Sequence, residues 1–194
     1  MSELTLYSVS TNAVLLQTRQ SERIEQLLKQ RGIGFERWPA HHQLDFNASA
    51  AEILATYKSE IERTQSRGNF PCVDAIRVLP DHPDRAALRQ KFLREHIHAE
   101  DEVRFFVEGR GLFCLHIGNE VVQVLCETND WISVPAGTRH WFDMGEKPCF
   151  CTLRFFNNPS GWVAEFTGDS IADRYPSLNT SWESGCEQQT SLNR

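Results

Sequence analysis

Four side chains that could bind a metal or take part in catalysis lie at even-numbered positions between residues 96 and 104. They are His96, His98, Glu102 and Arg104. Alternate side chains of an extended strand point to the same face, so a regular strand would direct all four into one cavity. Two imidazoles and a carboxylate are nitrogen and oxygen donors of the kind that bind a divalent transition metal. The spacing therefore predicts a metal site.

A third imidazole follows later in the chain. The sequence Pro-Ala-Gly-Thr-Arg-His ends at His140, so a turn delivers this histidine to the start of another strand. In a closed β-barrel, residues distant in sequence can face one another across the interior. His140 is therefore a candidate fourth ligand. The remaining histidines lack such convergence, and we assign His41, His42, His82 and His116 to structural or surface roles.

Most of the elements that must position these residues are strands. From residue 96 to about residue 156, turn signals interrupt strand-length apolar segments roughly every 8–12 residues, which is typical of an all-β sandwich or barrel. The N-terminal part is mixed, with strands predicted over 4–9, 35–38 and 72–79 and helices over 21–30 and 85–92. Ser49 and Glu52 form a capping box for another helix, whose apolar face continues to Ile61.

We therefore expect a mainly β fold with peripheral helices. One domain is predicted over residues 1–177, with a mixed helix and strand part over 1–92 and a metal-binding barrel core over 93–166. Residues 178–194 are polar and without periodicity, and we expect a disordered tail there.

Composition excludes several classes of partner. The chain has 194 residues, with 20 Lys and Arg against 26 Asp and Glu. It contains no basic cluster of the kind that nucleic acids or anionic membranes require. The first residues carry an acid where a secretory signal needs a basic patch. We expect a cytoplasmic monomer whose six cysteines are reduced thiols, mostly in apolar surroundings.

Two motifs resemble those of the cupin superfamily. The first is H-x-H, then E, then G, and the second is P-x-G-x-x-H. They match His96, His98, Glu102 and Gly109, and then Pro135, Gly137 and His140. Two positions depart from the pattern, because Gln90 stands where a glycine is usual and Met144 where an asparagine is usual. The resemblance implies the cupin-type double-stranded β-barrel, or jelly roll.

A narrower resemblance covers most of the chain. Residues 92–109, 111–113, 132–136 and 140–145 are similar to the acireductone dioxygenases of methionine salvage, in their bacterial form. The similarity extends from the N-terminal helices to residue 176. It implies one Fe(II) or Ni(II) ion per chain, bound by His96, His98, Glu102 and His140.

The same resemblance implies the reaction. Its partners are the small molecule acireductone and dioxygen, and the metal acts as a Lewis acid and template. In this family the iron form gives 4-methylthio-2-oxobutanoate and formate. The nickel form gives 3-methylthiopropionate, carbon monoxide and formate. Arg104, on the face of Glu102, would stabilise the substrate dianion.

Other residues are candidates with a structural alternative. Glu95 and Asp101 have the wrong strand parity to bind the ion. The family suggests roles for them in metal loading and conformational change, and a solvated acidic face is the alternative. Arg154 could reach the substrate pocket. Phe92, Phe142 and Trp162 could form its apolar wall, although aromatic residues at such positions are often plain core.

Two other functions fit the general motifs. One is another metal cupin, such as a quercetinase-like dioxygenase or a sugar isomerase with the same ligands. The other is a non-enzymatic cupin that binds a small ligand. Arg104 discriminates between enzyme and binding protein, since a simple binding barrel has no need of a buried guanidinium beside the metal carboxylate.

Overall fold

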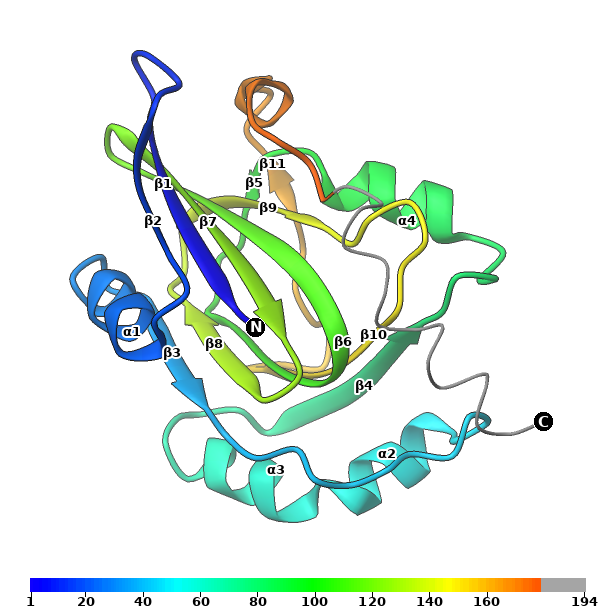
Figure 1. Cartoon of the computed structure of the whole chain (residues 1–194). Helices are drawn as coiled ribbons and strands as arrows, with labels where there is room; N and C mark the ends of the chain where they lie inside the picture. Colours follow the sequence, from blue (N-terminus) through cyan, green and yellow to red (C-terminus); the bar gives the residue numbers. More distant parts are fainter. Residues whose placement is uncertain (179–194) are drawn as a thin grey trace.

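One long strand organises the part of the chain that the computed structural model describes, residues 1–178. Strand β6 (Glu102–Ile117) is 16 residues long, and its two halves belong to different sheets (Figure 1). The first half pairs with β8 (Asp130–Val134) and β10 (Phe150–Phe156). The second half pairs with β7 (Glu120–Glu127) and β9 (Arg139–Asp143). All these pairings are antiparallel.

The remaining strands extend both sheets. Sheet A has the order β11-β5-β9-β6-β7-β1-β2, and sheet B has the order β4-β10-β6-β8-β3. Sheet A is completed by β1 (Glu3–Ser8), β2 (Val14–Thr18), β5 (His96–Ile97) and β11 (Glu165–Phe166). Sheet B is completed by β3 (Gly34–Arg37) and β4 (Cys72–Val78). The mainly β class is confirmed, with helices at the periphery.

The main core lies between the two sheets. Apolar side chains from β1, β7 and β9 of sheet A pack against those of β3, β4, β8 and β10 of sheet B. Four phenylalanine rings meet at its centre, with centroids 5.1–6.5 Å apart. They are Phe106, Phe113, Phe142 and Phe150. Because the two sheets share β6, burial of this core also fixes the angle at which they meet.

Helices cover the outer surfaces (Figure 1). Helix α1 (Ser21–Lys29) contributes Ile24, Leu27 and Leu28 to the main core. Helices α2 (Ala50–Thr56) and α3 (Lys58–Gln65) pack on the other face of sheet B. Helix α4 (Arg85–Phe92) is joined to β9 by Arg89, which donates two hydrogen bonds to Asp143 at 2.8 and 3.1 Å. A short 3-10 helix, η1 (Ile171–Arg174), follows β11.

The capping box at the start of α2 is present, but the helix is shorter than the sequence predicts. The Ser49 hydroxyl accepts from the backbone nitrogen of Glu52, and the backbone nitrogen of Ser49 donates to the Glu52 carboxylate. The predicted continuous helix breaks at Tyr57, whose backbone (φ −101°, ψ 27°) leaves the helical region. The ring of Tyr57 is fully buried and its hydroxyl donates to the carbonyl of His42, so tertiary contacts bend the chain there.

One predicted strand is also interrupted. The chain bends between His98 and Glu102, so that β5 lies in sheet A and β6 begins in sheet B. The expectation of one regular strand over residues 96–104 is therefore wrong. The bend carries Glu102 toward the histidines from the opposite sheet. The predicted tail, residues 178–194, lies outside the described residues except for Leu178.

Four cysteines have free thiols, as expected: Cys72, Cys114, Cys126 and Cys151. The expectation of a reduced thiol is wrong for Cys149, which is disulfide-bonded. Cys149 lies just before β10 and is only half-buried, whereas the Cys151 side chain points into the core. None of the helices among residues 1–178 is long and apolar enough to cross a membrane.

Gly109 allows β6 to pass from one sheet to the other. Its φ is +66°, and a Cβ built there would lie 1.8 Å from the carbonyl oxygen of Cys149. We expect Gly109→Ala to lower the free energy of unfolding by about 2–5 kcal/mol, because left-handed backbone strain adds to overpacking. Urea denaturation of the metal-free protein measures this loss.

Gly118 provides the matched control. It has a similar φ of +60°, but a Cβ there meets no atom within 4 Å. Gly118→Ala should therefore cost only the backbone strain, about 1–2 kcal/mol. Equal losses in the two variants would show that the contact with Cys149 contributes nothing.

Candidate metal centre

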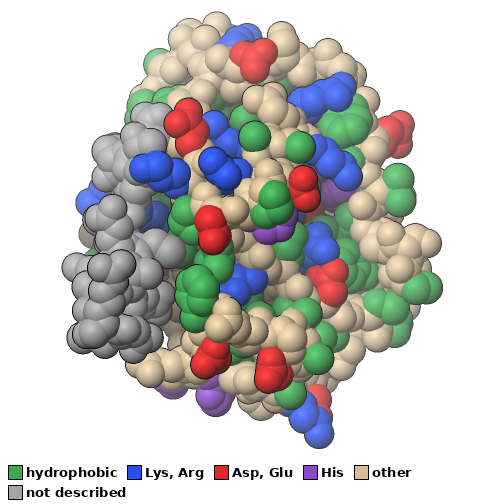
Figure 2. All heavy atoms as spheres, turned by 90° about the vertical axis from the view of Figure 1, so that its right-hand side faces the viewer, with side chains coloured by type: hydrophobic (Ala, Val, Ile, Leu, Met, Phe, Trp, Pro, Cys, Tyr) green, Lys and Arg blue, Asp and Glu red, His purple; other side chains and the backbone are tan. Residues whose placement is uncertain are grey.

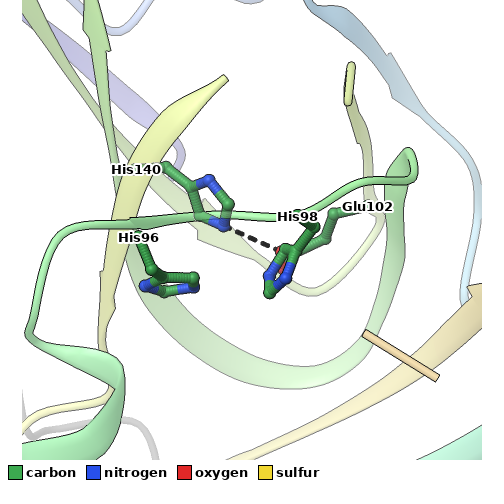
Figure 3. Close-up of side chains that lie close together, drawn as sticks. All are labelled: His96, His98, Glu102 and His140. Atoms are coloured by element: carbon green, nitrogen blue, oxygen red, sulfur yellow. Dashed lines mark hydrogen bonds and ion pairs between the residues drawn. The ribbon is translucent and has the colours of Figure 1, made fainter. Parts of the chain in front are cut away.

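Four buried side chains from both sheets meet at one point (Figure 3). His96 comes from β5 and lies opposite His140 of β9 in sheet A. His98 follows β5 directly, and Glu102 opens β6 in sheet B. One ligand atom from each residue lies within 4.8 Å of the others. The structure thus brings together the four residues that the sequence selects, although they come from three strands and a bend.

The carboxylate of Glu102 lies at the centre of this cluster. Its Oε2 is 2.9 Å from Nε2 of His140 and 3.1 Å from Nε2 of His98. The ring of His96 completes the group, with centroids 4.4 Å from His140 and 4.9 Å from His98. Two imidazoles therefore contact the carboxylate, and the third lies against both of them.

Backbone carbonyls fix the orientation of each imidazole. The Nδ1 of His96 is 2.7 Å from the carbonyl oxygen of Arg94, and that of His140 is 2.7 Å from the carbonyl oxygen of Thr138. The Nδ1 of His98 is 3.0 Å from the carbonyl oxygen of Val163. A carbonyl oxygen only accepts, so each ring donates from Nδ1 and directs Nε2 inward, the atom through which it would coordinate a metal.

Burial and neighbouring charges shift the pKa values of three of these four side chains. Burial, reinforced by His140, lowers the pKa of His96 to about 4. Burial alone would raise the pKa of Glu102, but Arg104 and His140 hold it well below its usual value. Burial would lower the pKa of His98, but its hydrogen bond to Glu102 outweighs this effect, and the pKa is raised. His96 is thus neutral and Glu102 ionised at neutral pH, which are the forms that coordinate a metal.

This donor set fits a divalent transition metal. Imidazole nitrogens suit Fe, Ni, Cu and Zn, and a carboxylate adds an anionic oxygen. All four side chains are at least 94% buried, so a charge at their centre would be shielded from solvent. One ligand atom from each residue lies within 4.8 Å of the others, so a single ion among them could contact all four.

Arg104 lies beside the cluster, as its strand parity predicts. Its Nε donates to Oε1 of Glu102 at 2.7 Å, and the side chain is buried. The guanidinium lies 4.8 Å from the ring of Phe142 and 5.2 Å from that of Trp162. Burial lowers the pKa of Arg104 while Glu102 opposes the change. A guanidinium keeps its proton in proteins, so a fixed positive charge adjoins the site.

Glu95 and Asp101 do not contact the ligand side chains. Asp101 accepts from the backbone nitrogen of Ala136 at 2.9 Å, and so holds the turn that precedes His140. Its carbonyl accepts from the indole of Trp162 at 3.2 Å. Glu95 is buried on the reverse face of sheet A, which excludes a solvated acidic face for this residue. Both therefore contact elements that support the site.

Of the other pocket candidates, Phe92 and Phe142 belong to the core, whereas Arg154 and Trp162 line a cavity. Phe92 packs edge-on against Phe142, with centroids 6.5 Å apart, on the Arg104 side of the core. Arg154 is the cross-strand neighbour of Arg104, but it donates two hydrogen bonds to Asp74, at 2.8 and 2.6 Å. With Trp162, it lines a cavity of about 420 Å³.

Sequence reasoning missed several supporting groups. His116, assigned to a structural or surface role, is partly buried and contacts the fully buried carboxylate of Glu95. The carbonyl groups that orient the histidines carry no side-chain signal. Figure 2 shows one face of the molecule, on the α4 side of Figure 1, where basic and acidic side chains are interspersed and histidine atoms are visible between them.

Comparisons with known proteins agree with this site. Residues 7–164 match the model of the ARD/ARD′ family. The acireductone dioxygenase of Synechococcus sp. (strain WH7803) is 64% identical over 92% of this chain and 99% of its own length. That of Prochlorococcus marinus (strain MIT 9313) is 62% identical over 92% of this chain and the whole of its own.

A solved structure is also similar. It is an acireductone dioxygenase from Bacillus anthracis with a cadmium ion in its active centre. The TM-score is 0.74 at 28% identity, over 86% of this chain and 98% of that one. The cupin-type fold that the motifs imply is therefore confirmed. With a family match over most of its length and relatives above 60% identity, this chain belongs to the ARD/ARD′ family.

Proposed function

We propose that this chain is an acireductone dioxygenase of methionine salvage, a metal-dependent oxidoreductase. The observation that carries this proposal is the inward-facing set of three imidazoles and a carboxylate, with a buried guanidinium bound to the same carboxylate. Family membership agrees with it. The substrates are acireductone and dioxygen.

One Fe(II) or Ni(II) ion per chain would be held by His96, His98, Glu102 and His140. When bound, the ion supplies a Lewis acid and a template for the two adjacent oxygens of the substrate. The protein contributes three imidazoles that are already oriented by backbone carbonyls. It also contributes a carboxylate that is already ionised, while the hydrogen bond from His98 to Glu102 must give way when the metal enters.

Arg104 provides the charge that the reaction needs beside the metal. Its Nε is occupied by Glu102, and its planar guanidinium carries further N–H donors. A fixed cation in a site that excludes water stabilises the doubly deprotonated substrate more strongly than it would in solvent. Deprotonation makes the substrate electron-rich enough to react with dioxygen. Arg104 is therefore the catalytic residue for formation of the dianion.

The aromatic rings around Arg104 form the apolar part of the substrate site. Phe142 and Trp162 lie on the guanidinium, and Phe92 packs behind Phe142. Their apolar surface suits the methylthio end of the substrate. Arg154 extends the site on the side of the cavity that it lines with Trp162. Asp101 and Glu95 act indirectly, through the elements that they anchor.

We also propose the setting in which the enzyme works. Residues 1–177 form one domain, which acts as a cytoplasmic monomer. With iron, the products are 4-methylthio-2-oxobutanoate and formate. With nickel, they are 3-methylthiopropionate, carbon monoxide and formate.

Removal of one imidazole should empty the site. We expect His96→Ala and His140→Ala each to lose most of the bound metal, because a chelating site of three ligands binds far more weakly than one of four. Elemental analysis of the purified proteins measures metal per chain. His41→Ala, at an exposed histidine, is the control and should keep its metal. Full occupancy in both site variants would place the metal elsewhere.

The metal should determine the products. Apoprotein loaded with Fe(II) is expected to give the keto acid and formate, and the same apoprotein loaded with Ni(II) to release carbon monoxide. Gas chromatography detects the carbon monoxide, and the uncatalysed reaction with air is the control. If neither metal form consumes acireductone faster than that background, the dioxygenase assignment is wrong.

Arg104→Ala should keep its metal but fail to form the substrate dianion. Without the guanidinium the substrate pKa stays high, so we expect kcat/KM to fall by about 100-fold or more. Anaerobic ultraviolet absorbance of the enzyme with acireductone reports the dianion. Arg104→Lys should recover part of the loss, since an ammonium lacks the planar fork. A normal dianion spectrum in metal-loaded Arg104→Ala would leave Arg104 a structural residue.

A further inference from the structure

A buried carboxylate and a partly buried imidazole form a pair on the reverse face of sheet A, directly behind the histidine cluster. Glu95 precedes His96 in the chain, so their side chains point to opposite faces. The Glu95 side chain is fully buried, and its Oε1 is 2.7 Å from Nδ1 of His116. Its Oε2 accepts from the hydroxyl of Thr167 at 2.6 Å. Both carboxylate oxygens are therefore occupied.

The pair spans the strand that carries another ligand. In sheet A, β9 lies between β5 and β6. Glu95 directly precedes β5, and His116 belongs to β6, where it lies opposite Arg139 of β9. The contact therefore passes behind β9, next to His140. It joins the segment that carries His96 to the strand that begins with Glu102.

The backbone at Glu95 links this pair to a ligand. The carbonyl that accepts from Nδ1 of His96 belongs to Arg94, so it is part of the peptide group that joins Arg94 to Glu95. The carbonyl of Glu95 itself accepts from the backbone nitrogen of Thr167 at 3.2 Å. Anchoring the Glu95 side chain thus fixes the peptide plane that orients His96.

Stability alone does not account for such a pair. A buried carboxylate is costly to desolvate, and replacing a buried ion pair by apolar side chains is often neutral or stabilising. The same face of sheet A carries an apolar cluster that includes Trp141, Leu112 and Tyr175. A polar anchor at this point therefore needs a reason other than packing. The pair can instead serve to fix the orientation of the neighbouring Arg94–Glu95 peptide group.

We propose that His116 is a positioning residue for the metal centre. It holds Glu95 so that the Arg94 carbonyl keeps Nδ1 of His96 as a donor and Nε2 directed at the ion. The proposal rests on the proposed function, since it assumes that the four-residue cluster binds a divalent metal. Groups that orient metal-ligating histidines affect metal affinity by about 10–100-fold.

The test uses Co(II) alone as the probe. Its affinity is measured by competition with a chelator, and its visible absorption reports the ligand geometry. We expect His116→Leu to weaken Co(II) binding by about 10–100-fold and to change the spectrum. His116→Asn should recover most of the affinity, because the amide nitrogen of asparagine can take the place of Nδ1.

The matched control is Gln123→Leu. Gln123 is buried on the same face of sheet A, and its amide donates to the carbonyl of Pro176 at 2.7 Å and to Sγ of Cys114 at 3.4 Å. Its loss should lower the melting temperature of the apoprotein but leave Co(II) affinity and spectrum unchanged. Should His116→Leu not fold, Thr167→Val removes the other partner of Glu95. It should weaken Co(II) binding roughly threefold.

The outcomes separate the two proposals. If the unaltered protein binds no Co(II), the proposed metal function fails. If it binds Co(II) but His116→Leu, or Thr167→Val in its place, keeps the same affinity and spectrum, His116 is a structural residue. If Gln123→Leu weakens Co(II) binding as much as His116→Leu, the effect is general and the positioning role is overturned. Loss in His116→Leu with recovery in His116→Asn supports it.

Discussion

The arrangement of the site and of the strands around it depends on a single buried negative charge, the carboxylate of Glu102. A carboxylate inside a protein must be paired or must coordinate a metal. Here one oxygen accepts from Arg104, and the other faces His98 and His140. The guanidinium neutralises the charge when the site is empty. The imidazoles of His98 and His140 contact the same carboxylate, and together with His96 they are the ligands with which it could bind a cation.

The two sheets hold this charge between them. Because β6 crosses from sheet B into sheet A at Gly109, one strand begins with the carboxylate and arginine of the site and ends beside the strand of His140. The phenylalanine core between the sheets lies next to Arg104 and sets the distance between the two sheets that carry the site. The same phenylalanine rings therefore fill the core and shield the guanidinium of Arg104 from solvent.

The sequence predicted the side chains of the site better than their supports. His96, His98, Glu102 and His140 could be found because their types and spacing match a metal site, and Arg104 followed from parity. The bend between His98 and Glu102 could not, since it depends on pairing with two different sheets. Strand β2 was missed because its apolar residues are consecutive, so its sequence does not alternate between apolar and polar side chains. Val14 and Leu15 are both exposed in the structure. The carbonyls that orient the rings are invisible in any sequence.

The hydrogen bond from His98 to the carbonyl of Val163 has a consequence for the order in which the site is completed. The two residues are 65 positions apart, and Val163 lies beyond the last long strand of the fold. On the ribosome, His96, Glu102 and His140 leave the exit tunnel before the segment that orients His98. The imidazole of His98 can take its final direction only after that segment has docked. Maturation of the centre therefore waits for a late part of the polypeptide, although every ligand has already been synthesised.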